Sequence, residues 1–110
     1  VLDVSVDLRK DSPTFGKHVV IILSEENKKQ ILIPRGFAHG FITLSEKSIF
    51  QYKVDRYYHP DSDSGIAAND NTLGINWQIP ESEWIQSDKD KKHPTLAEAT
   101  LFDYNEDLYV

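Results

Sequence analysis

Hydrophobic and polar residues alternate over the first eight positions of the chain. Apolar side chains stand at Leu2, Val4, Val6 and Leu8, and the positions between them are polar. A period of two residues is typical of a β-strand that buries one face. The pattern therefore predicts a half-buried strand over residues 2–8.

More β-strands are predicted further along the chain. Residues 17–23 (KHVVIIL) are rich in β-branched side chains, which favour extended structure. The remaining predicted strands are short and cover residues 30–33, 40–44, 48–54 and 77–79. Within the 48–54 strand, alternation places Phe50, Tyr52 and Val54 on one face.

Little helix is predicted. Ser87 is a suitable N-cap for a short helix that runs to Lys91 and ends before Pro94, and a weak helical turn covers residues 96–99. Residues 59–76 are rich in Pro, Gly, Asn and Asp and are predicted to form loops. Short, closely spaced strands with little helix indicate an all-β fold, either an antiparallel barrel or a sandwich.

The chain opens inside a predicted strand and contains no methionine. We therefore expect further strands on the N-terminal side of Val1, and a single domain over residues 1–110 that is incomplete without them. A set of short strands leaves exposed sheet edges unless another segment or subunit covers them. We expect a partner for these edges, either the N-terminal strands, a second protomer or both.

Composition narrows the classes of function. The net charge is −6 and the chain has no basic stripe, so nucleic acid and anionic membranes are not expected partners. There is no cysteine, which excludes disulfides and thiolate metal sites. No apolar run is long enough to span a membrane, and no signal-peptide pattern opens the chain. These features are compatible with a cytoplasmic enzyme.

Two side chains in the predicted strands are candidates for acid–base chemistry. Pro34 and Gly36 set a tight turn, and His39 follows at the start of the next strand, where an imidazole that titrates near pH ~6.5 can donate, accept or ligate. Tyr52 is the second candidate, because a phenol inside a barrel can donate a proton. From the residues alone, His39 is equally well a structural histidine, and packing is the commoner role of an inward-facing tyrosine.

Two further groups are candidates for ligand binding. Tyr57 and Tyr58 point to opposite faces of an extended chain, so one of them can present its ring to a nucleobase, with edge packing as the alternative. The run from Ser87 to Lys92 is a charged cluster, and such a cluster most often forms a solvated face. Its functional alternative is one carboxylate turned toward a histidine and one lysine facing a phosphate.

The order of these motifs resembles the dTDP-4-dehydrorhamnose 3,5-epimerase family. The resemblance is carried by IPRGFAHGF at residues 33–41 and by SPTFG at residues 12–16, and it extends to about Leu96. Supporting motifs are Tyr52-Lys53, Tyr57-Tyr58-x-Pro60, Gly74-Ile75-x-Trp77 and Ser87-Asp88-Lys89-Asp90. The resemblance implies a cupin-type jelly-roll barrel (a double-stranded β-helix), incomplete at its N-terminus and with short C-terminal helical segments. It also implies a homodimer that uses no metal or other cofactor.

The family inverts C3 and C5 of a 4-keto-6-deoxyhexose attached to dTDP by removing and returning protons. By resemblance, Tyr52 matches the proton donor and His39 matches a pocket histidine near the reacting sugar. Asp90, rather than Asp88, matches the carboxylate that orients the family's basic histidine. That histidine, in an Arg-Gly-x-His segment, and the enolate-stabilising lysine lie upstream of the first strand seen here. We therefore expect little or no turnover by the 110-residue chain alone.

The resemblance also implies residues that bind the nucleotide part of the substrate. Lys89 resembles a contact to the diphosphate, and Tyr58 resembles the ring that stacks on thymine. Asp63 stands where the family often has a glutamate that touches the nucleotide. The expected ligand is a dTDP-4-keto-6-deoxyhexose.

Other functions fit the same fold. A metal-dependent cupin enzyme with His39 as a ligand would need three or more protein ligands, and the chain has no His-x-His pair. A non-catalytic sugar-nucleotide-binding module would bind ligand without proton exchange. An enzyme that inverts one carbon, or that acts on another dTDP-sugar, is a third alternative that the sequence does not separate from the first reading.

Overall fold

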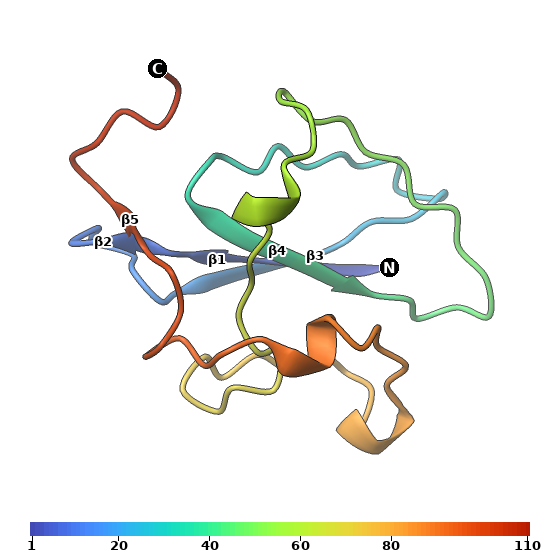
Figure 1. The fold of residues 1–110 in the computed structure, drawn as a ribbon. Coiled ribbons are helices and arrows are strands. Elements are labelled where there is room, and N and C mark those ends of the chain that lie inside the picture. The colour runs from blue at the N-terminus through green and yellow to red at the C-terminus, as the bar shows by residue number, and fades with distance from the viewer.

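A central antiparallel sheet organises the computed structural model, which describes residues 1–110. Its three strands are β1 (Leu2–Asp7), β3 (His18–Ile22) and β4 (Phe37–Ile42), in the order β3-β1-β4. Figure 1 shows residues 65–98 (yellow to orange) on one side of this sheet, while residues 24–35 and 43–58 loop out from its other side. The strands predicted over 2–8 and 17–23 are confirmed, and β4 begins three residues before the predicted strand over 40–44.

The central strand β1 is buried on both faces. Leu2, Val4 and Val6 are at most 3% exposed on one face, and Asp3 and Asp7 are each 1% exposed on the other. The prediction of a half-buried strand was therefore wrong, because alternation reports which face is apolar and does not show that the polar face meets water. Neighbours on both edges and both faces cover β1.

The apolar face of β1 forms the core. Leu73 and Trp77 complete its fully buried cluster, and Trp84 packs against it with its ring centroid 5.9 Å from that of Trp77. Each indole N–H donates to a backbone carbonyl, from Trp77 to Ala68 and from Trp84 to Ile79. These bonds satisfy the polar end of each indole ring, so residues 65–84 pack on the sheet although they contain no helix or strand beyond one 3₁₀ turn.

A second, two-stranded sheet ties the C-terminal tail to the first strand. β2 (Arg9–Lys10) pairs in parallel with β5 (Phe102–Asp103). The Arg9 guanidinium lies 4.8 Å from the ring centroid of Phe37 and 5.1 Å from that of Tyr104. Cation–π contacts on two rings therefore join β2, the start of β4 and the tail.

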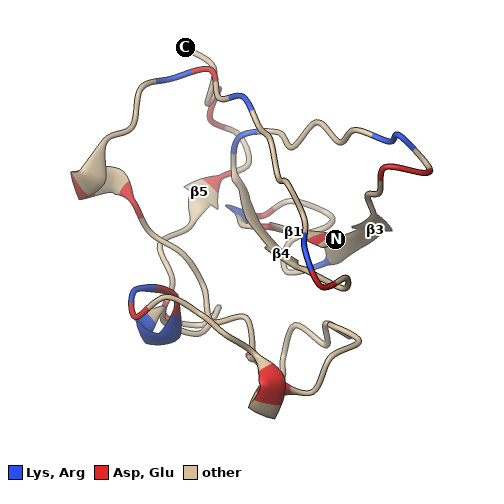
Figure 2. Ribbon diagram, turned by 90° about the vertical axis from the view of Figure 1, so that its right-hand side faces the viewer, with Lys and Arg blue, Asp and Glu red and all other residues tan.

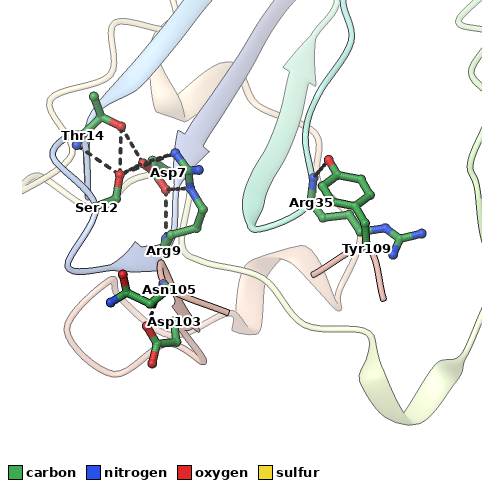
Figure 3. A network of polar contacts seen from close by, with 8 residues as sticks. All are labelled: Asp7, Arg9, Ser12, Thr14, Arg35, Asp103, Asn105 and Tyr109. Atoms are coloured by element: carbon green, nitrogen blue, oxygen red, sulfur yellow. Dashed lines mark hydrogen bonds and ion pairs between the residues drawn. The ribbon is translucent and has the colours of Figure 1, made fainter. Parts of the chain in front are cut away.

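The buried carboxylate of Asp7 folds the loop that follows β1 (Figure 3). It accepts two hydrogen bonds from the Arg9 guanidinium, at 2.9 and 3.0 Å, and one each from the hydroxyls of Ser12 (2.6 Å) and Thr14 (2.5 Å). Burial raises the pKa of the Asp7 carboxyl, but the hydrogen bonds from Arg9, Ser12 and Thr14 outweigh it and hold the pKa well below its usual range. The SPTFG loop is thus built around one ionised group.

Three of the predicted strands are absent. Residues 30–33, 48–54 and 77–79 have no strand hydrogen bonds, and Ile49 and Tyr52 are 101% and 73% exposed. A strand requires another strand whose N–H and C=O groups pair with its own, and none pairs with these segments. The all-β class holds, but the structure contains no closed barrel.

Helical structure is limited to short 3₁₀ turns. They are η1 (Pro60–Ser62), η2 (Glu81–Glu83) and η3 (Asp90–Lys92). The helix predicted over 87–91 is thus a single turn whose N-cap is Lys89 rather than Ser87. The Ser87 hydroxyl accepts a hydrogen bond from the Asp90 N–H at 3.1 Å. Figure 2 shows the acidic η2 and the mainly basic η3 as separate coils. No helix in the structure is long and apolar enough to cross a membrane.

The Asp7 network predicts an acid-sensitive contribution to stability. Because the pKa of Asp7 is lower in the folded chain, its stabilising effect is complete above the unfolded pKa of about 4 and is lost as the pH falls below that value. We expect Asp7→Asn to lower the free energy of unfolding by about 3 kcal/mol at pH 7 and by less at pH 3. Urea denaturation at both pH values measures this difference, with the exposed Asp11→Asn as control. Equal effects of the two substitutions would contradict the assignment.

Candidate functional site

A groove of about 770 Å³ runs along the outer edge of β4. Its floor is mainly apolar and includes Val4, Val6 and Trp77. Its polar lining comes from two directions, with His39 on β4 and Asp63, Lys89, Asp90 and His93 on the chain segments that cross the open edge of the strand. The groove wraps around this edge, because the His39 ring lies on the Asp3 face of the sheet, opposite Val4 and Val6. An apolar cleft that carries a few polar groups is a usual form of a small-molecule site.

His39 is paired with a buried carboxylate that sequence reasoning missed. Its Nε2 lies 2.7 Å from Oδ2 of Asp3, which is on the neighbouring strand β1 and is 1% exposed. The His39 side chain is 31% exposed, so one ring edge is held from behind while the rest can meet a ligand. An ionised carboxylate can only accept a hydrogen bond, so we assign the proton to Nε2 and leave Nδ1 free.

The other carboxylate oxygen of Asp3, Oδ1, is buried and has no hydrogen-bond partner. Buried polar atoms are normally hydrogen-bonded, so Asp3 Oδ1 is an exception within this network. The only sequence signal for Asp3 was an acidic residue between Leu2 and Val4, which strand alternation assigned to the solvent face.

Tyr52 stands at the end of a row of aromatic rings. The Phe41 and Phe50 rings are stacked with centroids 4.0 Å apart, and the Phe50 centroid is 6.1 Å from both the His39 and the Tyr52 rings. Tyr52 is 73% exposed, its hydroxyl makes no hydrogen bond, and it does not line the groove. The structure therefore links His39 to Tyr52 through Phe50, but it does not place both rings in one hollow as expected.

The three predicted nucleotide-binding residues come together at the groove. Oδ2 of Asp63 accepts hydrogen bonds from Lys89 Nζ at 2.6 Å and from the Tyr58 hydroxyl at 3.1 Å. The hydrogen bond from Lys89 is the main cause of the lowered pKa of Asp63, with a smaller contribution from Tyr58, and it raises the pKa of Lys89 in turn. Tyr58 is 73% exposed, so its ring is open to a planar ligand.

Asp90 is paired with a different histidine from the one expected. Its Oδ1 lies 3.3 Å from Nε2 of His93, three residues further along η3 and its C-cap. The His93 ring packs against Gly65, where an added Cβ would be 2.8 Å from the imidazole. Asp90 and His93 therefore join the two chain segments on the far wall of the groove, and the role of Asp90 toward the family's basic histidine stays a prediction.

Comparison with known proteins identifies the family. The family model described as dTDP-4-dehydrorhamnose 3,5-epimerase matches residues 1–98. The chain belongs to this family. It is similar to the dTDP-4-dehydrorhamnose 3,5-epimerases of Salmonella typhimurium (52% identity over 104 residues, 92% of this chain and 55% of the relative) and Escherichia coli (51% over 98 residues, 89% and 52%). The chain thus spans about half the length of the curated relatives it matches.

Solved structures agree with this placement. A dTDP-6-deoxy-D-glucose-3,5-epimerase from Legionella pneumophila, in complex with dTDP-4-keto-L-rhamnose, is 45% identical with a TM-score of 0.88 over 96% of this chain and 57% of its own. A double mutant of ChmJ, a 3'-monoepimerase from Streptomyces bikiniensis in complex with dTDP, is 30% identical with a TM-score of 0.78 over 94% of this chain and 53% of its own. The open three-stranded sheet is therefore similar to part of the epimerase fold.

We expect Asp3 to select the His39 tautomer. In Asp3→Asn the amide can donate or accept, so the preference for a proton on Nε2 should disappear. Two-bond ¹H–¹⁵N correlation spectra of the ring nitrogens report the tautomer directly. The exposed Asp61→Asn serves as the matched control and should leave the His39 signals unchanged. An unaltered His39 tautomer in Asp3→Asn would show that the pair has no orienting role.

Proposed function

We propose that this chain binds a dTDP-4-keto-6-deoxyhexose and takes part in its epimerisation at C3 and C5 to dTDP-4-dehydro-L-rhamnose. The observation that carries the proposal is the family match over residues 1–98, combined with a groove whose polar lining includes His39 and Lys89. Relatives of similar fold were solved with dTDP and with a dTDP-keto-sugar.

The chemistry follows from the substrate. The C4 ketone acidifies the protons on both neighbouring carbons, so a base can remove each proton to give an enolate. A hydrogen-bond donor or cation stabilises that enolate, and an acid returns a proton to the opposite face. No cofactor is required by these steps.

We assign the acid side of the reaction to this chain. Tyr52 is the proposed proton donor, and its exposed, unbonded hydroxyl is available to a substrate. His39, oriented by Asp3, is proposed to contact the sugar beside the carbonyl through its free Nδ1. The stacked rings of Phe41 and Phe50 lie between His39 and Tyr52, and we propose that they offer an apolar surface to the C–H face of the hexose.

We assign the nucleotide end to the cluster of Tyr58, Asp63 and Lys89. The Tyr58 ring is proposed to stack on thymine, with Asp63 as a further nucleotide contact. Lys89 is proposed to bind the diphosphate, which requires it to exchange its present bond to Asp63 for phosphate oxygens. Such an exchange replaces one charge-assisted hydrogen bond by another.

The base is not assigned within this chain. The family pattern places it in an Arg-Gly-x-His segment, and residues 1–110 contain no such sequence. A cytoplasmic location and a homodimer also remain predictions. The fully exposed Ile49 and the 92%-exposed Leu32 are apolar surface that a second copy could cover, and analytical ultracentrifugation of the purified chain tests the assembly.

We expect the chain to bind dTDP through Lys89. Lys89→Gln removes a charge-assisted contact to phosphate and should weaken binding about tenfold. Isothermal titration calorimetry measures the affinity, with Lys92→Gln as the matched control, because Lys92 lies on the same turn and its side chain makes no hydrogen bond. An equal loss of dTDP affinity in both variants would show that only the net charge matters, and it would contradict a specific contact between Lys89 and phosphate.

We expect the chain alone to exchange protons slowly. In deuterated water, incorporation at C3 and C5 of the keto-sugar nucleotide should be at least ~10²-fold slower than with the Escherichia coli relative assayed in parallel, since a missing general base costs at least this factor. Mass spectrometry and NMR of the sugar measure the incorporation. Rapid exchange that is abolished by His39→Asn would contradict the assignment and place the base within these residues.

A further inference from the structure

The segment that carries Tyr52 has almost no polar attachment to the rest of the molecule. Residues 49–57 form no regular secondary structure and make no backbone–backbone hydrogen bond. Only two hydrogen bonds of any kind reach this segment, and both run from Arg35 to the carboxylate of Asp55. The position of Tyr52 must therefore depend on a few side-chain contacts.

Arg35 contacts three residues, of which two are adjacent in the C-terminal tail. Its Nε and Nη2 donate to Oδ2 of Asp55 at 3.1 and 2.6 Å, and its Nη1 donates to the Leu108 carbonyl at 2.6 Å. The guanidinium carbon lies 4.7 Å from the ring centroid of Tyr109. The Tyr109 hydroxyl in turn accepts from the Arg35 backbone N–H at 3.0 Å, as Figure 3 shows.

The C-terminal tail keeps this guanidinium in place. Gly36 has a φ of +89°, and a Cβ there would lie 2.9 Å from a methyl carbon of Leu108, so the tail packs directly on the turn. The tail lies beyond residue 98, where the match to the family model ends. Arg35 is therefore held by a part of this chain that is outside the matched region.

The second attachment of the segment is aromatic. Phe50 stacks on Phe41 of β4 with an interplanar angle of 5°. Tyr52 thus lies between two anchors, Phe50 and Asp55, and both of these lead back to the short stretch of chain around His39. Arg35 precedes His39 by four residues and Phe41 follows it by two, so the two anchors together set the separation between His39 and Tyr52.

We propose that Arg35 is a positioning residue, which holds Asp55 and thereby fixes the Tyr52 phenol relative to His39. The inference rests on the proposed function, in which Tyr52 is the proton donor and its position relative to His39 therefore matters. A displacement of about 1 Å in a reacting group is enough to lower a catalysed rate substantially, so a remote contact of this kind can control a site. Arginine suits the role, because its planar fork can donate to Asp55 and Leu108 at once and stack on Tyr109.

Limited trypsin digestion tests the anchoring without any ligand. We expect Arg35→Gln and Asp55→Asn each to speed cleavage after Lys53 about fivefold, as for the loss of one ion pair from a local opening equilibrium. Cleavage after Lys29, in another exposed loop, should not change. The double variant should cleave no faster than either single variant. The matched control is Arg56→Gln, because Arg56 is exposed and its side chain makes no hydrogen bond.

NMR separates positioning from general structural support. Arg35→Gln and Asp55→Asn should weaken the ring–ring NOE between Phe50 and Tyr52, while the signals of the His39–Asp3 pair stay unchanged. With dTDP-glucose as the probe, both variants should keep the wild-type Kd within about twofold and lose NOEs from Tyr52 to the hexose, because the Lys89 cluster is separate. An Arg35→Gln spectrum with altered His39 and Asp3 signals would overturn the proposal in favour of a fold-wide role.

Asp55→Asn keeps the test decisive, because Asp55 is 63% exposed and the substitution removes only the anchor. If its Lys53 cleavage and its Phe50–Tyr52 NOE equal those of the wild-type chain, Arg35 does not position Tyr52. If the wild-type chain binds no dTDP-glucose, the proposed function fails. In that case faster cleavage with a weakened Phe50–Tyr52 NOE would still support the anchoring, and unchanged cleavage would overturn it.

Discussion

Two carboxylates buried on one face of the central strand determine how this chain is organised. An ionised carboxylate removed from water must find donors, and Asp7 and Asp3 meet this requirement in different ways. Asp7 gathers Arg9, Ser12 and Thr14, and so it folds the loop after β1. Asp3 instead engages His39 and leaves one oxygen without a partner. The same constraint thus produces a fully bonded carboxylate at one end of β1 and, at the other end, a buried carboxylate with one oxygen bonded to His39.

The strands that could be predicted from the sequence are those whose partners lie within it. Alternation identified β1 and β-branched residues identified β3, because each of these strands finds a neighbour in the chain. Residues 48–54 have the same pattern, yet no strand pairs with them. A local pattern reports the preference of a segment, whereas a sheet also requires hydrogen-bonding neighbours that one segment cannot reveal.

Site residues could be predicted where a recognisable motif contains them. They could not be predicted where their role depends on burial that the sequence does not reveal. The motif around His39 and the resemblance of Tyr58, Asp63 and Lys89 indicated residues that the structure brings to the groove or its rim. Asp3 was missed because hydrophobic alternation treats an acidic residue as solvent-facing. The placement of Tyr52 on an inward strand face was wrong for the same reason as its strand, since no other strand pairs with residues 48–54.

Because residues 49–57 are weakly attached, the Arg35–Asp55 pair affects folding stability and the position of Tyr52 to different degrees. An ion pair in which Asp55 is 63% exposed contributes at most about 1 kcal/mol to folding, so its loss leaves the core around β1 intact. The same pair provides the only hydrogen bonds to the segment that carries Tyr52, so its effect on geometry is large. Arg35 therefore contributes little to whether the chain folds, and much to whether the phenol and the imidazole are correctly spaced when it has folded.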